Sequence, residues 1–230
     1  MSEGSYIKGK EKLLFKIYKV LLDSYGPQHW WPAETRYEVV VGAVLTQNTS
    51  WKNVEKAIRN LKNEDLIDEI KILNIDEDVL KALIKPAGFY NIKAKRLKNI
   101  TKYIVENYKT TEHMARSNKG LKELRKELLS IKGIGPETAD SILLYALDRE
   151  SFVVDAYTKR IFSRLNIINE KMSYDEIKKV FEANLPKDLQ IYKEYHALIV
   201  EHAKRVCKKN PLCDNCPIKK VYICDGDYKR

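Results

Sequence analysis

The sequence predicts an all-α protein, because apolar residues recur at helical spacing along most of the chain. No sustained period-two alternation is present, and no Asn-Gly or Asp-Gly pair joins two β-branched runs. The local exceptions, Val39 to Val41 and Phe152 to Val154, are too short to outweigh their helical surroundings. No low-complexity segment or linker divides the chain, so any two domains are expected to pack tightly together.

The first predicted helix runs from Lys12 to Tyr25, where apolar residues recur at helical spacing and Gly26-Pro27 ends the segment. Short breaks that contain Asn, Asp, Gly or Pro separate the later helices. These are expected over Arg36 to Leu45, Trp51 to Leu61, Asp76 to Ile84, Ile92 to Tyr108, Leu121 to Leu129, Pro136 to Leu147, Ala156 to Leu165, Tyr174 to Asn184 and Leu189 to Val206.

The charge balance favours a polyanionic partner. The chain has 42 lysines and arginines against 32 acidic residues, a formal net charge of +10 that is spread over its whole length. Nucleic acid is therefore a better candidate than a membrane surface. No apolar run is long enough to span a bilayer, and Met1 to Lys10 lacks a signal peptide's apolar stretch. We expect a soluble cytoplasmic protein associated with the nucleoid.

All four cysteines lie close to the C-terminus, in a C-x5-C-x2-C-x7-C pattern. Clustered cysteines in an intracellular protein indicate metal ligands before disulfides. Four thiolates in so short a span can hold a [4Fe-4S] cluster or a tetrahedral zinc ion, and the spacing alone does not separate the two. The candidate ligands are Cys207, Cys213, Cys216 and Cys224.

Two of the predicted helices are joined by the residues from Ser130 to Gly135, which contain a Gly-x-Gly turn. Gly133 and Gly135 permit positive φ, so that successive amides can point outward at the start of the next helix and bind an anion. Ile131 and Ile134 would attach the turn to the core through their apolar side chains. An ordinary turn between two helices is the alternative interpretation.

A carboxylate follows the hairpin at a distinctive place. Asp155 comes directly after the apolar run from Phe152 to Val154 and directly before another predicted helix. Such a carboxylate can be partly desolvated and yet kept ionised by helix amides, which suits it to stabilise a positive charge. The alternative is a plain N-cap for the helix that begins at Ala156.

The hairpin, the helix of small residues and the apolar-apolar-aspartate run, in this order, resemble the endonuclease III superfamily of DNA glycosylases. Leu45 to Thr49, Gly88 to Ala94 and the cysteines extend the resemblance over most of the chain. It implies a helix-hairpin-helix motif that grips a DNA phosphate without reading sequence. The contacts would come from Lys132, Gly133, Ile134 and Gly135.

The resemblance also implies the domain organisation. We expect two helical domains that flank a DNA-binding cleft. A six-helix domain over residues 28–149 would contain the hairpin. A second helical domain, built from residues 1–27 plus 150–230, would carry a small iron-sulfur cluster loop at its C-terminus.

Within this family, Asp155 matches the catalytic aspartate, which supports the charge that develops on the sugar as the base leaves. Members that also cut the strand use a lysine two residues past the second glycine of the hairpin. Here that position is Glu137. The resemblance therefore predicts a monofunctional enzyme that uses water as the nucleophile and leaves an abasic site.

The damaged base must leave the duplex, which costs a few kcal/mol of unstacking. Gln47 matches the glutamine that the family inserts into the vacated stack, and Phe89 matches an apolar wedge against the opposite base. Phe89 in the core is the alternative. The expected partner is double-stranded DNA with a damaged base, bound by a monomer, and no membrane.

The three tryptophans gather around the glutamine segment and suggest aromatic faces for an extruded base. Stacking favours an electron-poor or cationic ring such as an alkylated purine. The hairpin without a lysine, the Trp-Trp-Pro triplet and the Leu-Thr-Gln-Asn-Thr run are together similar to the 3-methyladenine glycosylase branch of the superfamily. Aromatic filling of a domain interface is the alternative. The expected base pocket comprises Trp30, Trp31, Pro32, Trp51 and Glu137.

For the cysteines, the resemblance favours a structural [4Fe-4S] cluster over zinc or disulfides, although the loop lengths differ from the usual C-x6-C-x2-C-x5-C. Two other functions stay open. One is a bifunctional endonuclease III-type glycosylase and AP lyase on oxidised pyrimidines, and the other is a DNA-binding protein without catalysis.

Overall fold

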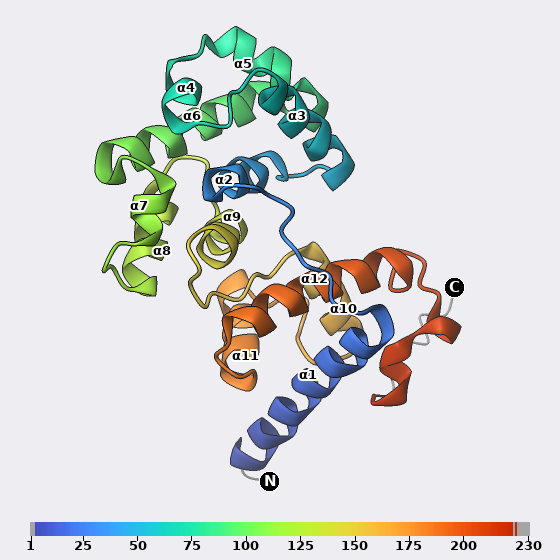
Figure 1. Cartoon of the computed structure of the whole chain (residues 1–230). Helices are drawn as coiled ribbons and strands as arrows, with labels where there is room; N and C mark the ends of the chain where they lie inside the picture. Colours follow the sequence, from blue (N-terminus) through green and yellow to red (C-terminus); the bar gives the residue numbers. More distant parts are fainter. Residues whose placement is uncertain (1–2, 223, 225–230) are drawn as a thin grey trace. The chain divides into compact units, whose positions relative to one another are not determined.

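The computed structural model describes the backbone of residues 3–222 and of residue 224, and side chains from residue 13 onward within those ranges. Across these residues the protein is helical and has no β-strand, as predicted. The α-helices are α1 (Glu3–Tyr25), α2 (Arg36–Leu45), α3 (Trp51–Asn63), α4 (Glu69–Asn74), α5 (Glu77–Ile84), α6 (Tyr90–Tyr108), α7 (Thr111–Ala115), α8 (Leu121–Ser130), α9 (Pro136–Ser141), α10 (Ala156–Arg164), α11 (Tyr174–Asn184) and α12 (Leu189–Arg205) (Figure 1). None of these helices combines the length and apolar character needed to cross a bilayer.

The chain divides into two compact units. The hairpin unit is continuous from Trp31 to Arg149, and the terminal unit combines the residues up to Trp30 with those from Glu150 onward. The division falls three residues later than the expected boundary at residue 28, because Trp30 packs with the terminal unit.

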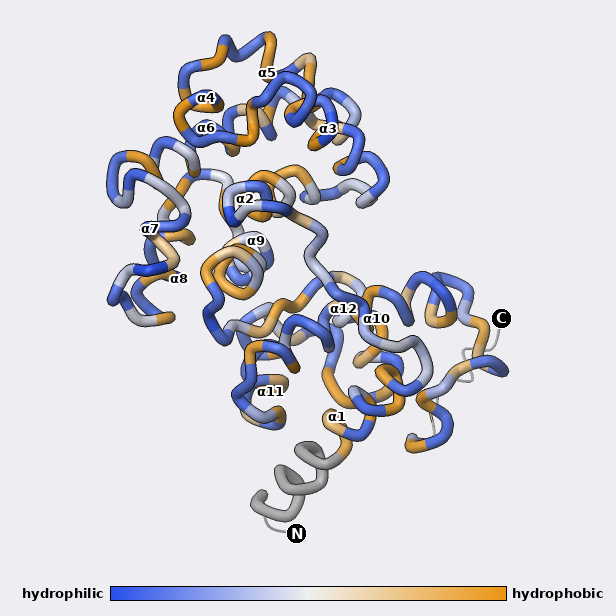
Figure 2. Tube along the Cα trace, in the orientation of Figure 1, coloured by the Kyte–Doolittle hydropathy of each residue, from blue (hydrophilic) through white to orange (hydrophobic). Residues whose placement is uncertain are grey.

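The hairpin unit is built around α2. All residues of this helix after Arg36 are buried, and they pack against α3, α6 and the segment that follows α9. Figure 2 shows the hydrophobic stretch of α2 within this unit. Thr35 starts the helix, because its side chain accepts a hydrogen bond from the Glu38 amide.

The hairpin unit, all of whose residues are described, contains eight α-helices, where six were expected. The two additional helices are α4 and α7, which the sequence did not indicate. They have six and five residues and begin with the side-chain caps Asp68 and Thr110. Helices this short show too few apolar repeats to be recognised from periodicity.

The helix predicted from Pro136 to Leu147 is also corrected. It is α-helical to Ser141 and then continues as a π-helical segment, η2 (Ile142–Ala146). Its five residues are all buried. A π-helical turn widens the helix and shifts the side chains that follow, which apolar spacing does not reveal.

The terminal unit has an aromatic core. Phe152 stacks on Phe181 with ring centroids 4.4 Å apart, and Tyr195 joins them at edge-on angles. The Tyr195 hydroxyl donates to the Leu14 carbonyl at 2.9 Å and so links α12 to α1. Because Phe152 is buried in this core, the extended segment that it begins holds Asp155 at the start of α10.

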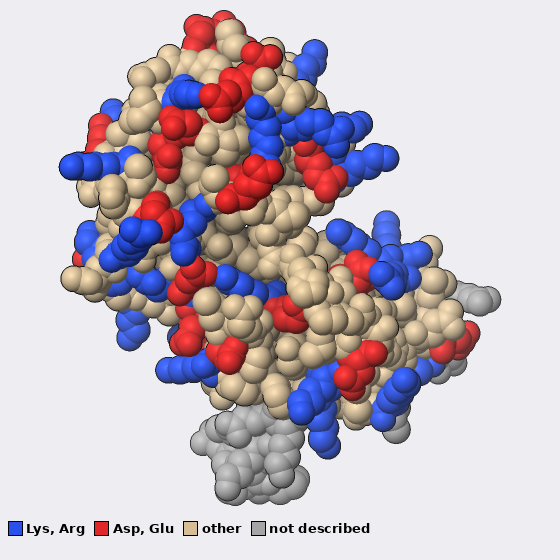
Figure 3. All heavy atoms as spheres, in the orientation of Figure 1, with Lys and Arg blue, Asp and Glu red and all other residues tan. Residues whose placement is uncertain are grey.

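Acidic and basic side chains alternate over the visible surface of each unit (Figure 3). Many of them form short ion pairs within one helix, such as Lys81 with Glu77 and Arg205 with Glu201. Exposed pairs of this kind contribute little to stability. On the face that Figure 3 shows, the basic side chains are spread over the surface and are not gathered into one patch.

Candidate active site

The hairpin turn lies between α8 and α9 as expected. Ile131 and Ile134 are buried, and the Ile134 amide donates to the Ile131 carbonyl at 3.0 Å to close the turn. Lys132 is exposed at the tip. Gly133 has φ +98°, a backbone conformation that side chains with a Cβ rarely adopt.

Gly135, unlike Gly133, does not use the positive φ that a glycine permits. Its φ is −92° and its ψ is 176°, so it is the extended N-cap residue of α9. A Cβ added at Gly135 would meet no atom within 4 Å, because the space beside it is open. Of these two glycines, Gly133 alone has a backbone conformation that calls for glycine. Gly135 instead leaves room beside the start of α9.

Gln47 is held against this turn by both ends of its amide. Its Nε2 atom donates to the Gly133 carbonyl at 3.2 Å and to the Thr138 hydroxyl at 2.8 Å. Its Oε1 atom accepts from Arg96 Nη1 at 2.5 Å. Arg96 also packs on Gly133, where an added Cβ would lie 2.4 Å from its Cγ. Gln47 is thus joined to the hairpin both directly and through Arg96, a residue that no local pattern indicates.

Phe89 is exposed, with 66% of its surface accessible, so the alternative of a core residue is wrong. It is the N-cap residue of α6 and has a left-handed backbone with φ +47°. This conformation is uncommon for an aromatic residue and is a form of local strain. The exposed ring is consistent with the wedge role.

Lys93 anchors the segments that carry Gln47 and Phe89. It is 1% exposed, and its ammonium donates to the carbonyls of Leu45 and Ala87, both at 2.8 Å. Those carbonyls lie at the ends of α2 and of the short helix η1 (Lys85–Ala87). Burial, together with the charge of Arg96, lowers the pKa of Lys93 to about 8.

The tryptophans fall into two groups. Trp31 and Trp51 meet edge to face in the hairpin unit, with centroids 5.2 Å apart, and the ring centroid of Tyr145 also lies 5.2 Å from that of Trp31. Trp31 also lies on Gly42, where a Cβ would be 3.0 Å from the indole. Trp30 belongs to the terminal unit. Pro32 and Glu137 are exposed.

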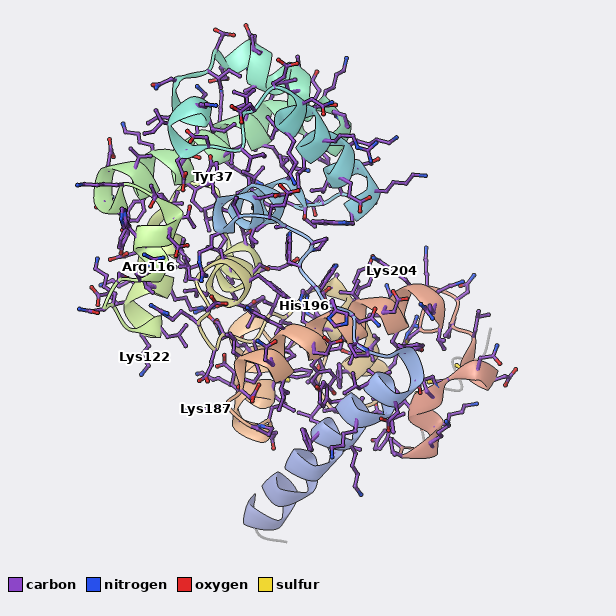
Figure 4. The ribbon with its side chains drawn as sticks, viewed as in Figure 1. Tyr37, Arg116, Lys122, Lys187, His196 and Lys204 are labelled. Atoms are coloured by element: carbon purple, nitrogen blue, oxygen red, sulfur yellow. The ribbon has the colours of Figure 1, made fainter. Side chains whose placement is uncertain are left out.

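Asp155 uses its two carboxylate oxygens differently. Oδ1 caps α10, because it accepts from the Thr158 amide at 2.7 Å and from the Thr158 hydroxyl at 2.8 Å. Oδ2 lies 3.6 Å from Nε2 of His196 on α12, labelled in Figure 4. Burial raises the pKa of Asp155, but the contacts with His196 and Thr158 outweigh it, so the pKa is lowered overall.

The four cysteines line a single pocket together with apolar residues of α10 and α12, and none of them forms a disulfide. Arg164 Nη1 lies 3.4 Å from the Cys207 sulfur, and the same guanidinium donates to the carbonyls of Lys208 and Lys209. No group of His, Cys, Asp or Glu side chains in the described part of the chain surrounds a point as ligands of one ion. The four thiols thus line one shared pocket.

Comparison with known proteins places these features in a family. The family described as "HhH-GPD superfamily base excision DNA repair protein" matches residues 41–187 of the chain. The chain belongs to the HhH-GPD superfamily. The matched residues of this HhH-GPD protein include Gln47, Phe89, the hairpin and Asp155, and end before the cysteines.

Similar proteins agree with this assignment. The Methanocaldococcus jannaschii protein "Putative DNA repair glycosylase MJ1434" is 74% identical over 216 residues, which are 94% of this chain and 98% of the relative. The structure of H. pylori 3-methyladenine DNA glycosylase (MagIII) bound to 1,N6-ethenoadenine is 34% identical, with a TM-score of 0.73, over 85% of this chain and 97% of that one. An endonuclease III–DNA complex shares the fold, with a TM-score of 0.77 at 19% identity over 92% and 94% of the two chains. This HhH-GPD protein is thus an enzyme of the DNA glycosylase kind.

Three further residues of this HhH-GPD protein emerge only from the structure, namely Arg96, Tyr145 and His196. Arg96 contacts Gln47 across 49 positions of sequence, and His196 lies on a different helix from Asp155. No local motif marks either contact. Tyr145 lies within an apolar helix pattern, where an aromatic residue is ordinarily core.

Proposed function

We propose that the protein is a monofunctional DNA glycosylase that removes an alkylated purine from double-stranded DNA. The observation that carries this proposal is the Asp155 carboxylate, which is nearly buried, kept ionised and fixed at a helix start. A buried anion held in place stabilises a developing positive charge more than a solvated one would.

The proposed reaction hydrolyses the bond between the sugar C1′ and the base nitrogen. The base leaves with the electron pair of that bond, and positive charge develops on the sugar beside Asp155. Asp155 stabilises this charge and accepts a proton from water, whose oxygen forms the new bond to C1′. The products are the free base and an abasic site.

Water is the proposed nucleophile because Glu137 occupies the position of the family's lysine. Glu137 is exposed in the first turn of α9 and has no amine that could form a Schiff base. Strand cleavage through a covalent adduct is therefore not expected of this chain.

The aromatic side chains support a cationic or electron-poor base. Trp31, Trp51 and Tyr145 form one cluster, and a purine that carries an extra alkyl group stacks well on such rings. The similar H. pylori protein is a 3-methyladenine glycosylase and was solved with an ethenoadenine. This likeness favours alkylated purines over oxidised pyrimidines.

DNA would be held by the hairpin, with Lys132 and the open space at Gly135 suited to a phosphate. Gln47 and Phe89 would fill the gap in the duplex and separate the opposite base. Gln47 would have to leave its hydrogen bonds with the hairpin in order to insert, whereas the ring of Phe89 is already exposed.

The four cysteines are proposed to hold a [4Fe-4S] cluster. They fit such a group, because four free thiols face one pocket whose walls include Ile161, Leu165 and Val206. When bound, the cluster would shape the loop after α12. Arg160 already supports this loop, since its Nε donates to the Cys207 carbonyl at 3.0 Å.

The test incubates the purified protein with duplexes that each carry one lesion, and develops the products with and without hot alkali. We expect cleavage only after alkali, and only on alkylated purines. Cleavage without alkali on oxidised pyrimidines, together with borohydride trapping of a covalent adduct, would instead show a bifunctional enzyme.

Asp155→Asn is the companion variant. An asparagine can still cap α10, so we expect normal folding and DNA binding with excision slowed by roughly 10²- to 10⁴-fold. Asp188→Asn is the matched control, because Asp188 is also an N-cap carboxylate of the terminal unit, at the exposed start of α12. Unchanged excision by Asp155→Asn would remove the catalytic assignment.

A further inference from the structure

His196 is a buried polar residue beside the proposed catalytic carboxylate. It is 5% exposed, and it lies in the part of α12 where Tyr195 and Ala197 to Val200 are also buried. Buried imidazoles usually have a specific polar neighbour. Here Nε2 lies 3.6 Å from Oδ2 of Asp155, the oxygen that does not cap α10.

The imidazole ring is fixed from a second side. Trp30 packs on it with ring centroids 5.5 Å apart and an interplanar angle of 45°. The chain before α2 is attached to α12 close by, because the Gln28 amide donates to the Glu194 carboxylate at 2.5 Å. Because it is buried and packed against an indole, His196 has little freedom to turn away from Asp155.

Both oxygens of Asp155 are thus positioned, each by a different element. Thr158 on α10 holds Oδ1, and His196 on α12 faces Oδ2. A carboxylate whose second oxygen were free could rotate, and the negative charge would then not stay where the sugar charge develops. The 3.6 Å separation between Nε2 and Oδ2 is that of a charge contact, which is longer than a hydrogen bond.

We propose that His196 is a positioning residue of the reaction centre, which orients Oδ2 of Asp155 and is itself held in place by Trp30. The proposal rests on the proposed function, in which Asp155 is the catalytic carboxylate. Trp30 accordingly supports the reaction centre from the side of His196, in addition to any contact with the base.

The experiment compares single-turnover excision by the full chain and by two variants, at saturating enzyme, on the lesion duplex that the wild type cleaves best. His196→Phe keeps a ring against Trp30 but removes the donor, and His196→Gln keeps a donor. We expect His196→Phe to slow excision by about 10- to 100-fold, because the contact that orients Oδ2 of Asp155 is lost and a small misplacement of a catalytic group is costly. His196→Gln should retain most of the rate.

A DNA-binding measurement distinguishes loss of positioning from loss of the folded structure. The affinity of His196→Phe for a duplex with an uncleavable abasic-site analogue should stay within about twofold of wild type. Tyr195→Phe is the matched control, because it removes a neighbouring buried hydrogen bond on α12 and should leave the excision rate unchanged. Equal rate losses in His196→Phe, His196→Gln and Tyr195→Phe would indicate a structural role and overturn the proposal.

A second readout does not require activity. Carboxyl ¹³C NMR should show the pKa of Asp155 rising toward its ordinary range in His196→Phe, since one stabilising contact is lost. An unchanged carboxyl titration would overturn the proposal even in a poorly active variant.

If Asp155→Asn is inactive while His196→Phe excises at the normal rate, only the inference about His196 fails. If Asp155→Asn stays active, the proposed function fails.

Discussion

At the residue scale, the two glycines of the hairpin have different structural roles. Gly133 is required by its positive φ and by Arg96, whose side chain fills the space where a Cβ would stand. Gly135 has ordinary extended geometry and open space beside it. The first glycine therefore maintains the turn, whereas the second leaves the surface at the start of α9 unobstructed.

Substitution should separate these roles. Gly133→Ala is expected to destabilise the hairpin unit by about 1–3 kcal/mol through backbone strain, and to displace Arg96 from Gln47. Gly135→Ala should leave the free energy of unfolding nearly unchanged while weakening DNA binding, because its methyl group would occupy the proposed phosphate site. Urea unfolding and duplex affinity measure the two effects.

Gly120→Ala is the control for both variants, since Gly120 caps α8 with a φ of −72° and open space around its Cβ position. Equal stability losses in Gly133→Ala and Gly120→Ala would contradict the strain argument. Undiminished DNA affinity in Gly135→Ala would contradict a phosphate site at that residue.

At the scale of the elements, Lys93 connects two helix ends whose following residues are proposed to enter DNA. Its ammonium is bound by carbonyls at the ends of α2 and η1, just before the segments of Gln47 and Phe89. Burial of the charge is nevertheless unfavourable, as the lowered pKa of about 8 shows. The buried charge of Lys93 thus connects the two helix ends but lowers the free energy of unfolding at neutral pH.

This cost gives a pH dependence of defined sign. The ordinary pKa of lysine is 10.5, so between pH 8 and 10.5 the unfolded chain binds more protons at Lys93 than the folded chain. Stability from this residue is therefore fully present above pH 10.5 and is lost as the pH falls through 8.

Relative to Lys93→Met, the unfolding free energy of the wild type should increase by roughly 1 kcal/mol per pH unit between pH 8 and 10. Chemical denaturation followed by circular dichroism at several pH values measures this difference. Lys95→Met is the control, because Lys95 is exposed on the same helix. A constant difference between wild type and Lys93→Met across this range would refute the buried-charge interpretation.

At the scale of the whole molecule, each unit has its own buried core, and the proposed chemistry draws on both. The hairpin unit carries the hairpin turn, Gln47 and Phe89, and the terminal unit carries Asp155, His196 and the cysteine pocket. The terminal unit also combines the first helix with the end of the chain. Its folding therefore depends on contacts between segments that are far apart in sequence.

The cysteine pocket predicts a metal content for the molecule. Protein purified without oxygen should contain about four iron atoms per chain and show the broad visible absorption of an iron-sulfur cluster. Cys213→Ala should lose both and unfold at a lower temperature. Stoichiometric zinc without iron, or a fully metal-free protein with normal stability, would contradict the cluster.

The sequence alone was sufficient for the features that depend on neighbouring residues. Helical spacing predicted the long helices, because each buries one face and repeats its apolar residues over several turns. The buried run before Asp155 and the turn at Gly133 were recognisable because both are complete within a few residues. The short helices α4 and α7 and the π-helical segment were missed, since a single turn or a local widening leaves no periodic pattern.

Tertiary structure decided which of these features meet. The contacts of Arg96 with Gln47, of Lys93 with Leu45 and of His196 with Asp155 join residues on different elements, which no local pattern encodes. The same packing separated Trp30 from Trp31, although they are adjacent in sequence. Local sequence thus determined the helices and the individual chemical groups. The burial of α2 and α12 against distant helices determined which groups share a site, because side-chain contacts between helices depend on how their apolar faces pack.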